Sequence, residues 1–357
     1  RPRLPWLICY GGWALLARCS GSSDAEQPSA AGWAQVLDHG SVLGFPSYRE
    51  ATDLLDSFVA QSPHLLSRKR IGASYLKRPI YAYVLGTQKT EEAGQRPQIL
   101  LTALTHAREP ASLTVVLYFL GRTLERYAEG DPQARYIVSS RELWFVPFVN
   151  PDGYIENEHL QDKIVRKNRR PTCDSSMDTG VDLNRNFGVH WSREFEPCNE
   201  EFQGSAPFSE PETQAIKRLC EENKFSAAMN FHSFGGMLTH PFNWASERML
   251  PADDQRVYDE IAKVFGWPRF GPAIRTVGYT ASGESDDWMY GTQHIISMSP
   301  EVGPEEGDFW PPREDIAGIN SRNYDRIAYV VLKAGLQLSG TWTHRPGTEA
   351  LKGGSGR

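Results

Sequence analysis

Apolar residues recur along the chain in two alternating patterns. Positions three and four apart predict helices, and short apolar runs between them predict strands. The expected helices are Tyr48–Gln61, Pro110–Tyr127, Glu210–Glu222, Ala252–Phe265 and Ile319–Leu338. The expected strands are Pro79–Gly86, Gln98–Leu104, Glu142–Val149, Ala227–Phe231 and Ile295–Met298. The run QILLTAL at 98–104 is apolar enough to be buried on both faces.

Strands that alternate with helices predict an α/β fold. We expect a single domain with a mixed parallel and antiparallel central sheet, flanked by helices on both faces. The sequence NPDG at 150–153 predicts a turn after the strand 142–149. Ligands of such folds bind beyond the carboxyl ends of the strands. The candidate motifs described below all fall at such ends.

The two ends of the chain differ from its middle. Leu4–Ala17 is nearly free of charge, too short for a membrane span of ~20 residues, and typical of a secretory signal. Residues 1–20 therefore predict a signal or a short anchor, with an ordinary apolar helix as the alternative. Residues 21–40 predict a linker, 41–340 the functional domain and 341–357 a tail. We expect a protein that is secreted or lies in the lumen of the secretory pathway, without stable membrane insertion once the signal is removed.

Composition narrows the classes of partner. With 40% hydrophobic and 23% charged residues, the chain is neither disordered nor collagen-like. Its 38 Lys and Arg face 44 Asp and Glu without a long basic run, so we expect no nucleic-acid partner. Cys220 lies in a helical pattern and is expected to be buried. Cys173 and Cys198 flank a loop-rich stretch and can pair in a secreted chain.

A possible metal site begins with His106 and Glu109, which follow the strand 98–104 in a tight loop. The two side chains can converge on one ion, but catalytic zinc takes three protein ligands. Taken alone, the pair also fits a helix start with an acid near the positive end of the dipole. His232, at the end of the strand SAAMNF, is the candidate third ligand, although a lone histidine there also fits a core residue.

Further polar motifs follow other elements. In GVDLNRNF at 180–187, Arg185 offers a fork for a carboxylate beside the Asn184 amide. Asp182 could accept the second ring N–H of a metal-bound histidine, and an Asx-rich turn is the plainer interpretation. Glu301, after the strand 295–298, could act as general base on a metal-bound water.

Together, these motifs resemble a known family. The order HAREP, NPDGY, GVDLNRNF, FSEPET, NFHS, YTASGESDDW, PEVG is similar to that of the zinc metallocarboxypeptidases, the family of pancreatic carboxypeptidases A and B, over residues 44–338. The resemblance implies one zinc ion per chain. The residues that match the ligands, the catalytic base and the arginine that polarises the scissile carbonyl are His106, Glu109, His232, Glu301 and Arg166, respectively.

The same resemblance implies an exopeptidase acting on peptide and protein C-termini. Asn184 and Arg185 match the pair that grips the terminal carboxylate, and Tyr279 matches a mobile tyrosine that closes over the substrate. Cys173 and Cys198 match a disulfide of the pancreatic members. The loop around Glu284 looks closer to that of bacterial secreted relatives. We expect a monomer.

Specificity is expected to depend on acids in the loop after Tyr279. Asp286, seven residues on, resembles the acid with which carboxypeptidase B selects C-terminal Lys and Arg. Glu284 lies where some bacterial relatives with dual preference also carry an acid. Alternatively, Asp286 faces solvent and Asp287 caps a helix beginning at Trp288, which would leave a broad specificity.

Two other functions fit part of the sequence. A catalytically inactive, peptide-binding relative would typically lose a ligand or the base, whereas all those positions carry suitable residue types here. A zinc deacylase of small amino-acid conjugates is compatible with Asn184 and Arg185, but Tyr279 and its loop favour peptides. Comparing activity on peptides and on acylamino acids distinguishes these possibilities.

Overall fold

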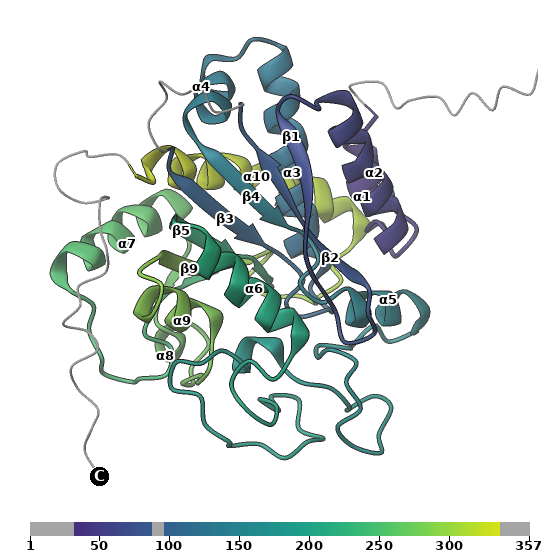
Figure 1. The fold of residues 1–357 in the computed structure, drawn as a ribbon, viewed down its shortest axis with the longest axis vertical. Helices are drawn as coiled ribbons and strands as arrows, with labels where there is room; N and C mark the ends of the chain where they lie inside the picture. The colour runs from purple at the N-terminus through teal and green to yellow at the C-terminus, as the bar shows by residue number, and fades with distance from the viewer. Residues whose placement is uncertain (1–31, 88–95, 336–357) are drawn as a thin grey trace, which may run out of the picture.

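The computed structural model describes residues 32–87 and 96–335 (Figure 1). The expected signal at 1–20 and the tail at 341–357 lie outside the described residues. Within the expected linker, the short helix α1 (Gln35–Asp38) lies in the described part. Trp33 and Leu37 there are buried in the core, so the packed domain begins before residue 41.

In the described residues, nine strands form one mixed sheet, which confirms the predicted fold class. The order is β1-β2-β4-β3-β5-β9-β7-β8, with β6 paired to β9. Strands β4, β3, β5 and β9 are parallel, while β1, β2 and β7 run antiparallel to their inner neighbours. The strands are β1 (Leu66–Ala73), β2 (Pro79–Leu85), β3 (Gln98–Thr102), β4 (Glu142–Val146), β5 (Phe225–Asn230), β6 (His232–Ser233), β7 (Met237–Thr239), β8 (Arg269–Gly271) and β9 (Ile296–Val302).

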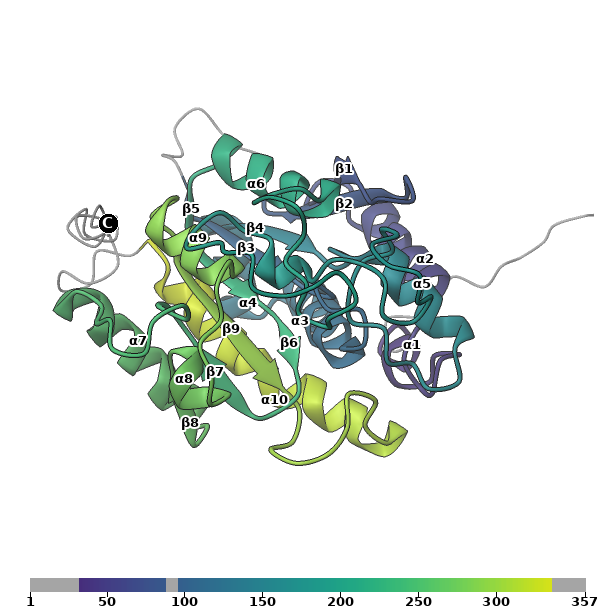
Figure 2. The ribbon, with the colours of Figure 1, turned by 90° about the horizontal axis from the view of Figure 1, so that it is seen from below.

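Helices cover both faces of the sheet (Figures 1 and 2). Ile99 and Leu101 of β3 pack toward the side of α2, α3 and α10, while Leu100 packs toward α6 and α9. This alternation confirms that β3 is buried on both faces. Besides α1, the α-helices are α2 (Tyr48–Gln61), α3 (Pro110–Ala128), α4 (Pro132–Ser140), α5 (Pro151–His159), α6 (Pro211–Glu222), α7 (Ala252–Phe265), α8 (Ala273–Thr276), α9 (Ser285–Gly291) and α10 (Arg313–Lys333).

Some expected elements differ from the structure. The turn predicted at 150–153 is wrong, because this segment starts helix α5. The Asn150 side chain accepts a hydrogen bond from the Gly153 N–H at 3.0 Å, and Pro151 takes the first helical position, where no donor is needed. The last helix also begins before Ile319 and ends before Leu338. In the described part of the chain, no helix combines the length and apolarity needed to cross a membrane.

Candidate active site

The predicted metal-binding residues meet where parallel strands end. The loop from β3 to α3 carries His106, and Glu109 lies at the N-cap of α3. His232 begins β6 directly after β5, and in the β6–β9 pairing it stands opposite Glu301. The parallel order of β3, β5 and β9 therefore brings three distant segments to one edge of the sheet.

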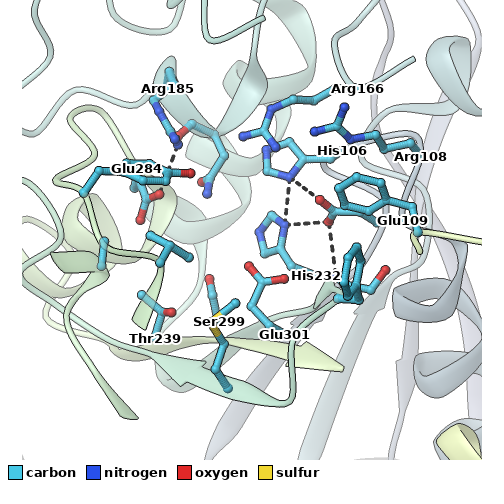
Figure 3. A pocket seen from close by; sticks show the side chains of 18 residues that line it. His106, Arg108, Glu109, Arg166, Arg185, His232, Thr239, Glu284, Ser299 and Glu301 are labelled. Atoms are coloured by element: carbon cyan, nitrogen blue, oxygen red, sulfur yellow. Dashed lines mark hydrogen bonds and ion pairs between the residues drawn. The ribbon is translucent and has the colours of Figure 1, made fainter. Parts of the chain in front are cut away.

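The side chains of His106, Glu109 and His232 converge (Figure 3). The two Nδ1 atoms are 3.0 Å apart, and each lies within 2.9 Å of one Glu109 carboxylate oxygen. All three residues are buried. The Glu109 side chain does not cap α3 and instead faces the imidazoles. Two imidazole nitrogens and a carboxylate form a donor set that suits zinc, so these residues fit a metal ion.

The charges around this group favour a cation. Burial raises the pKa of Glu109, but the two imidazoles lower it further, so its carboxylate is ionised. Burial and Arg166 lower the pKa of His106, which favours the neutral form that a ligand needs. Burial also lowers the pKa of His232, but Glu109 outweighs it and raises the value to about 9. Metal uptake at His232 must therefore release a proton.

Asp182 joins the metal group to Arg166. Its Oδ1 lies 3.2 Å from His106 Nε2, and its Oδ2 accepts from Arg166 Nε at 3.0 Å. As the N-cap of a 3-10 turn (Leu183–Arg185), it also accepts the Asn184 N–H at 2.9 Å. This fully buried carboxylate thus orients a candidate ligand, the arginine and the turn that carries Arg185.

A cavity of about 260 Å³ opens in front of the metal group. Tyr279 stands at its edge with 48% of its surface exposed. Figure 3 shows Arg185 and Glu284 across the cavity from the histidines. The expected site residues that line it are His106, Glu109, Arg166, Asn184, Arg185, His232, Tyr279, Glu284 and Glu301.

Asp286 lies behind this lining rather than in it. The residue is 1% exposed, and its Oδ1 accepts a hydrogen bond from Asn230 Nδ2 at 2.7 Å. Asp287 accepts backbone N–H groups of residues 243–244, and helix α9 already starts before Trp288. The alternative of a solvent-facing Asp286 beside a capping Asp287 is therefore wrong.

Comparison with known proteins identifies the family. Residues 51–326 match the sequence model of a protein family that is described as zinc carboxypeptidase. The chain belongs to the zinc carboxypeptidase family. Carboxypeptidase A1 of Bos taurus is 30% identical over 254 residues, covering 68% of this chain and 58% of that protein. Carboxypeptidase A4 of Mus musculus is 30% identical over 246 residues, covering 66% and 57%. The chain thus spans somewhat less than two thirds of the length of these relatives.

Two solved structures share the fold. Thrombin activatable fibrinolysis inhibitor has a TM-score of 0.73 at 22% identity, covering 86% of this chain and 78% of that one. Carboxypeptidase A from Helicoverpa armigera has a TM-score of 0.69 at 23% identity, covering 82% and 74%. These structural similarities support the same fold, a mixed sheet flanked by helices.

The zinc carboxypeptidase domain also contains site residues that sequence reasoning missed. Arg108 lines the cavity, with its guanidinium 4.2 Å from the Phe309 ring centre and an ion pair to Glu200. Its place inside HAREP was an available signal. Glu201 pairs with Arg185 Nη2 at 2.5 Å, and no motif marked it.

The disulfide is present as expected. Cys173 and Cys198 are bonded, with their Cα atoms 5.6 Å apart. The bridge ties the loop after Arg166 to the segment that carries Glu201. Cys220 is buried in α6, also as expected.

Proposed function

We propose that the protein is a zinc-dependent exopeptidase that hydrolyses the C-terminal peptide bond of peptides and proteins, with a preference for C-terminal Lys and Arg. The observation that carries the proposal is the juxtaposition in one cavity of a metal-binding group and the Arg185 guanidinium (Figure 3). A carboxylate bound by Arg185 would leave the adjacent peptide bond facing the metal group. That arrangement selects a free C-terminus.

The groups around the cavity have complementary chemical roles. Zinc held by His106, Glu109 and His232 would supply a Lewis acid and lower the pKa of water. Glu301 would take the proton of the attacking water and pass it to the leaving amine. Arg166, oriented by Asp182, would donate to the carbonyl oxygen as negative charge develops there.

The other end of the cavity would hold the substrate's terminus. Arg185 and Asn184 would bind the carboxylate, and Tyr279, half exposed at the rim, would cover the bound peptide. A cover of this kind favours peptides over small acylamino acids. The candidate metal ligands, the candidate base and the carboxylate-binding residues are all present in this chain, which favours an enzyme over an inactive binding protein.

The basic preference rests on two buried acids. Glu284 forms part of the cavity wall, and Asp286 is buried outside that lining. A buried cation needs an anionic partner, and either acid can provide one. Burial raises the pKa of Asp286 to about 6, which still leaves it mostly ionised at pH 7. The relatives named above are carboxypeptidases A1 and A4, and they do not supply the argument for a basic preference. The proposed preference for Lys and Arg therefore depends on Glu284 and Asp286 of this chain.

A peptide panel tests the proposed function. Matched peptides ending in Arg, Lys, Phe and Leu, and an acylamino acid, are assayed with and without a chelator. We expect turnover of peptides that the chelator abolishes, with the highest kcat/KM for Arg and Lys. Replacement Asp286→Ile should lower the Arg/Phe ratio of kcat/KM. A wild-type preference for Phe or Leu, or an unchanged ratio in the variant, contradicts the basic preference.

We also propose a secreted monomer. The Cys173–Cys198 disulfide supports an oxidising compartment, where such bonds persist. Light scattering of purified protein that gives a dimer mass would contradict the monomer. Recovery from cells with both thiols reduced would contradict secretion.

A further inference from the structure

The arginine assigned to the substrate's carboxylate already has partners within the chain. Arg185 Nη1 donates to Glu284 Oε1 at 3.1 Å and to the Asn184 carbonyl oxygen at 2.9 Å. Its Nη2 donates to Glu201 Oε1 at 2.5 Å. A guanidinium nitrogen of the Nη type carries two hydrogens. Both hydrogens of Nη1 are therefore engaged.

The two acidic partners of Arg185 lie on different sides of it. Glu284 lines the large cavity, whereas Glu201 lines a smaller neighbouring hollow. Figure 3 shows Glu284 beneath the Arg185 guanidinium, and both residues line the cavity. Glu284 is held there by a second contact, since its Oε2 accepts from Asn243 Nδ2 at 2.5 Å. Glu284 thus stands where a substrate's carboxylate would approach.

An incoming carboxylate and Glu284 compete for the same donor. A bidentate grip across the two Nη nitrogens needs one N–H from each. The Nη1 hydrogen that faces the cavity is the one bound to Glu284, and a second carboxylate beside it would meet like-charge repulsion. A terminal carboxylate that grips both Nη nitrogens therefore takes this N–H from Glu284.

We propose that Glu284 is a built-in competitor for Arg185, which the substrate's terminal carboxylate displaces and which then pairs with a cationic C-terminal side chain. This inference rests on the proposed carboxypeptidase activity, and it names Glu284 as the residue that determines the specificity of that activity. With a Lys or Arg terminus, the freed Glu284 loses the Arg185 guanidinium as its partner and gains the cationic side chain of the substrate. With a Phe or Leu terminus, it is left buried without a cation, which is unfavourable.

The surroundings of Glu284 support this exchange. Asn243 can keep its contact with Oε2 after Oε1 leaves Arg185, so the side chain stays in the cavity wall. Burial raises the pKa of Glu284 to about 7, although Arg185 opposes that rise. Asp286, bonded to Asn230 and outside the cavity lining, is less suited to meet the substrate first.

The test compares three full-length, zinc-loaded proteins: wild type, Glu284→Gln and Glu201→Gln. KM and kcat are measured on matched peptides ending in Arg, Lys, Phe and Leu. We expect Glu284→Gln to lower KM for the Phe and Leu peptides about tenfold, the scale of one hydrogen bond to a charged group. The Arg/Phe ratio of kcat/KM should fall with it. Glu201→Gln leaves Glu284 on Nη1, so its Arg/Phe ratio should match that of the wild type.

The outcomes separate this inference from the proposed function. If the wild type turns over none of the four peptides, the carboxypeptidase assignment fails and the inference with it. If the wild type is active but Glu284→Gln keeps the same KM values and the same Arg/Phe ratio, the inference alone is overturned. Should Glu284→Gln not fold, Glu284→Ala removes the same carboxylate and carries the same expectations.

Discussion

Replacing Asp182 by Asn tests whether one buried carboxylate aligns both the metal group and Arg166. The two oxygens of Asp182 lie 3.2 Å from His106 Nε2 and 2.9 Å from Arg166 Nη2. Asparagine keeps the shape but has one accepting oxygen and no charge. One of the two partners must therefore lose its acceptor, and Arg166 loses its anion in either case.

The size of the effect follows from burial. Asp182 is fully buried and the Arg166 side chain is 12% exposed, so water replaces little of the lost pairing. Breaking a buried ion pair costs about 3–5 kcal/mol. Loss of the acceptor behind a metal-ligating imidazole weakens metal binding about 10–100-fold. We expect Asp182→Asn to unfold at lower urea concentration and to bind zinc about 10–100-fold more weakly.

Asp152→Asn is the matched control. Asp152 is also buried and pairs with Arg78 at 2.7 Å, but it does not line the cavity. This variant should lose stability without losing zinc affinity. Urea denaturation measures the first quantity and competition with a chromophoric chelator the second. Wild-type zinc affinity in Asp182→Asn, or equal weakening in Asp152→Asn, would refute the reasoning.

The same variant should change the acid dependence of stability. Burial raises the pKa of Asp182, but Arg166 and His106 lower it further, to well below its usual value. A depressed folded-state pKa stabilises the protein above the unfolded value of about 3.9, and this contribution is lost as the pH falls. The free energy of unfolding should therefore drop less steeply from about pH 5 to pH 2 in Asp182→Asn than in the wild type. Parallel curves for the two proteins would contradict this expectation.

Three further predictions concern other parts of the site. Replacing His106 or His232 by Ala should remove bound zinc and activity together, and full metal content by atomic absorption in the double variant would contradict the ligand assignment. Glu301→Gln should retain zinc but lower kcat about 10²–10⁴-fold, and a loss below about tenfold would exclude Glu301 as the base. Thiol counting should find Cys173 and Cys198 oxidised, and reducing this bridge, which spans 25 residues, should lower stability by about 3.5 kcal/mol.

The sequence predicted the central elements because their burial leaves a pattern. β3 reads as a continuous apolar run, since Ile99 and Leu101 face one core and Leu100 the other. β1 (Leu66–Ala73) was missed because it lies at the edge of the sheet and buries only Leu66 of LSRKRIGA. This edge strand has no apolar alternation to detect.

The site was predictable to the extent that motifs sit at strand ends. His106 and His232 follow buried strands, and the parallel order of those strands brings them together. Glu201 could not be found in this way, because no strand or motif positions it. It reaches Arg185 from an irregular segment near the disulfide, and only the folded chain reveals that contact.

The acids at the start of α9 show why spacing alone cannot assign specificity. Glu284, Asp286 and Asp287 lie within four positions, yet each meets a different environment. Glu284 pairs with Arg185 at the cavity, Asp286 with Asn230 behind it, and Asp287 with the backbone of residues 243–244. Counting from Tyr279 selects Asp286, whereas the cavity lining selects Glu284. On our proposal, a basic C-terminal side chain would therefore pair with Glu284, which lines the cavity, rather than with Asp286, which does not.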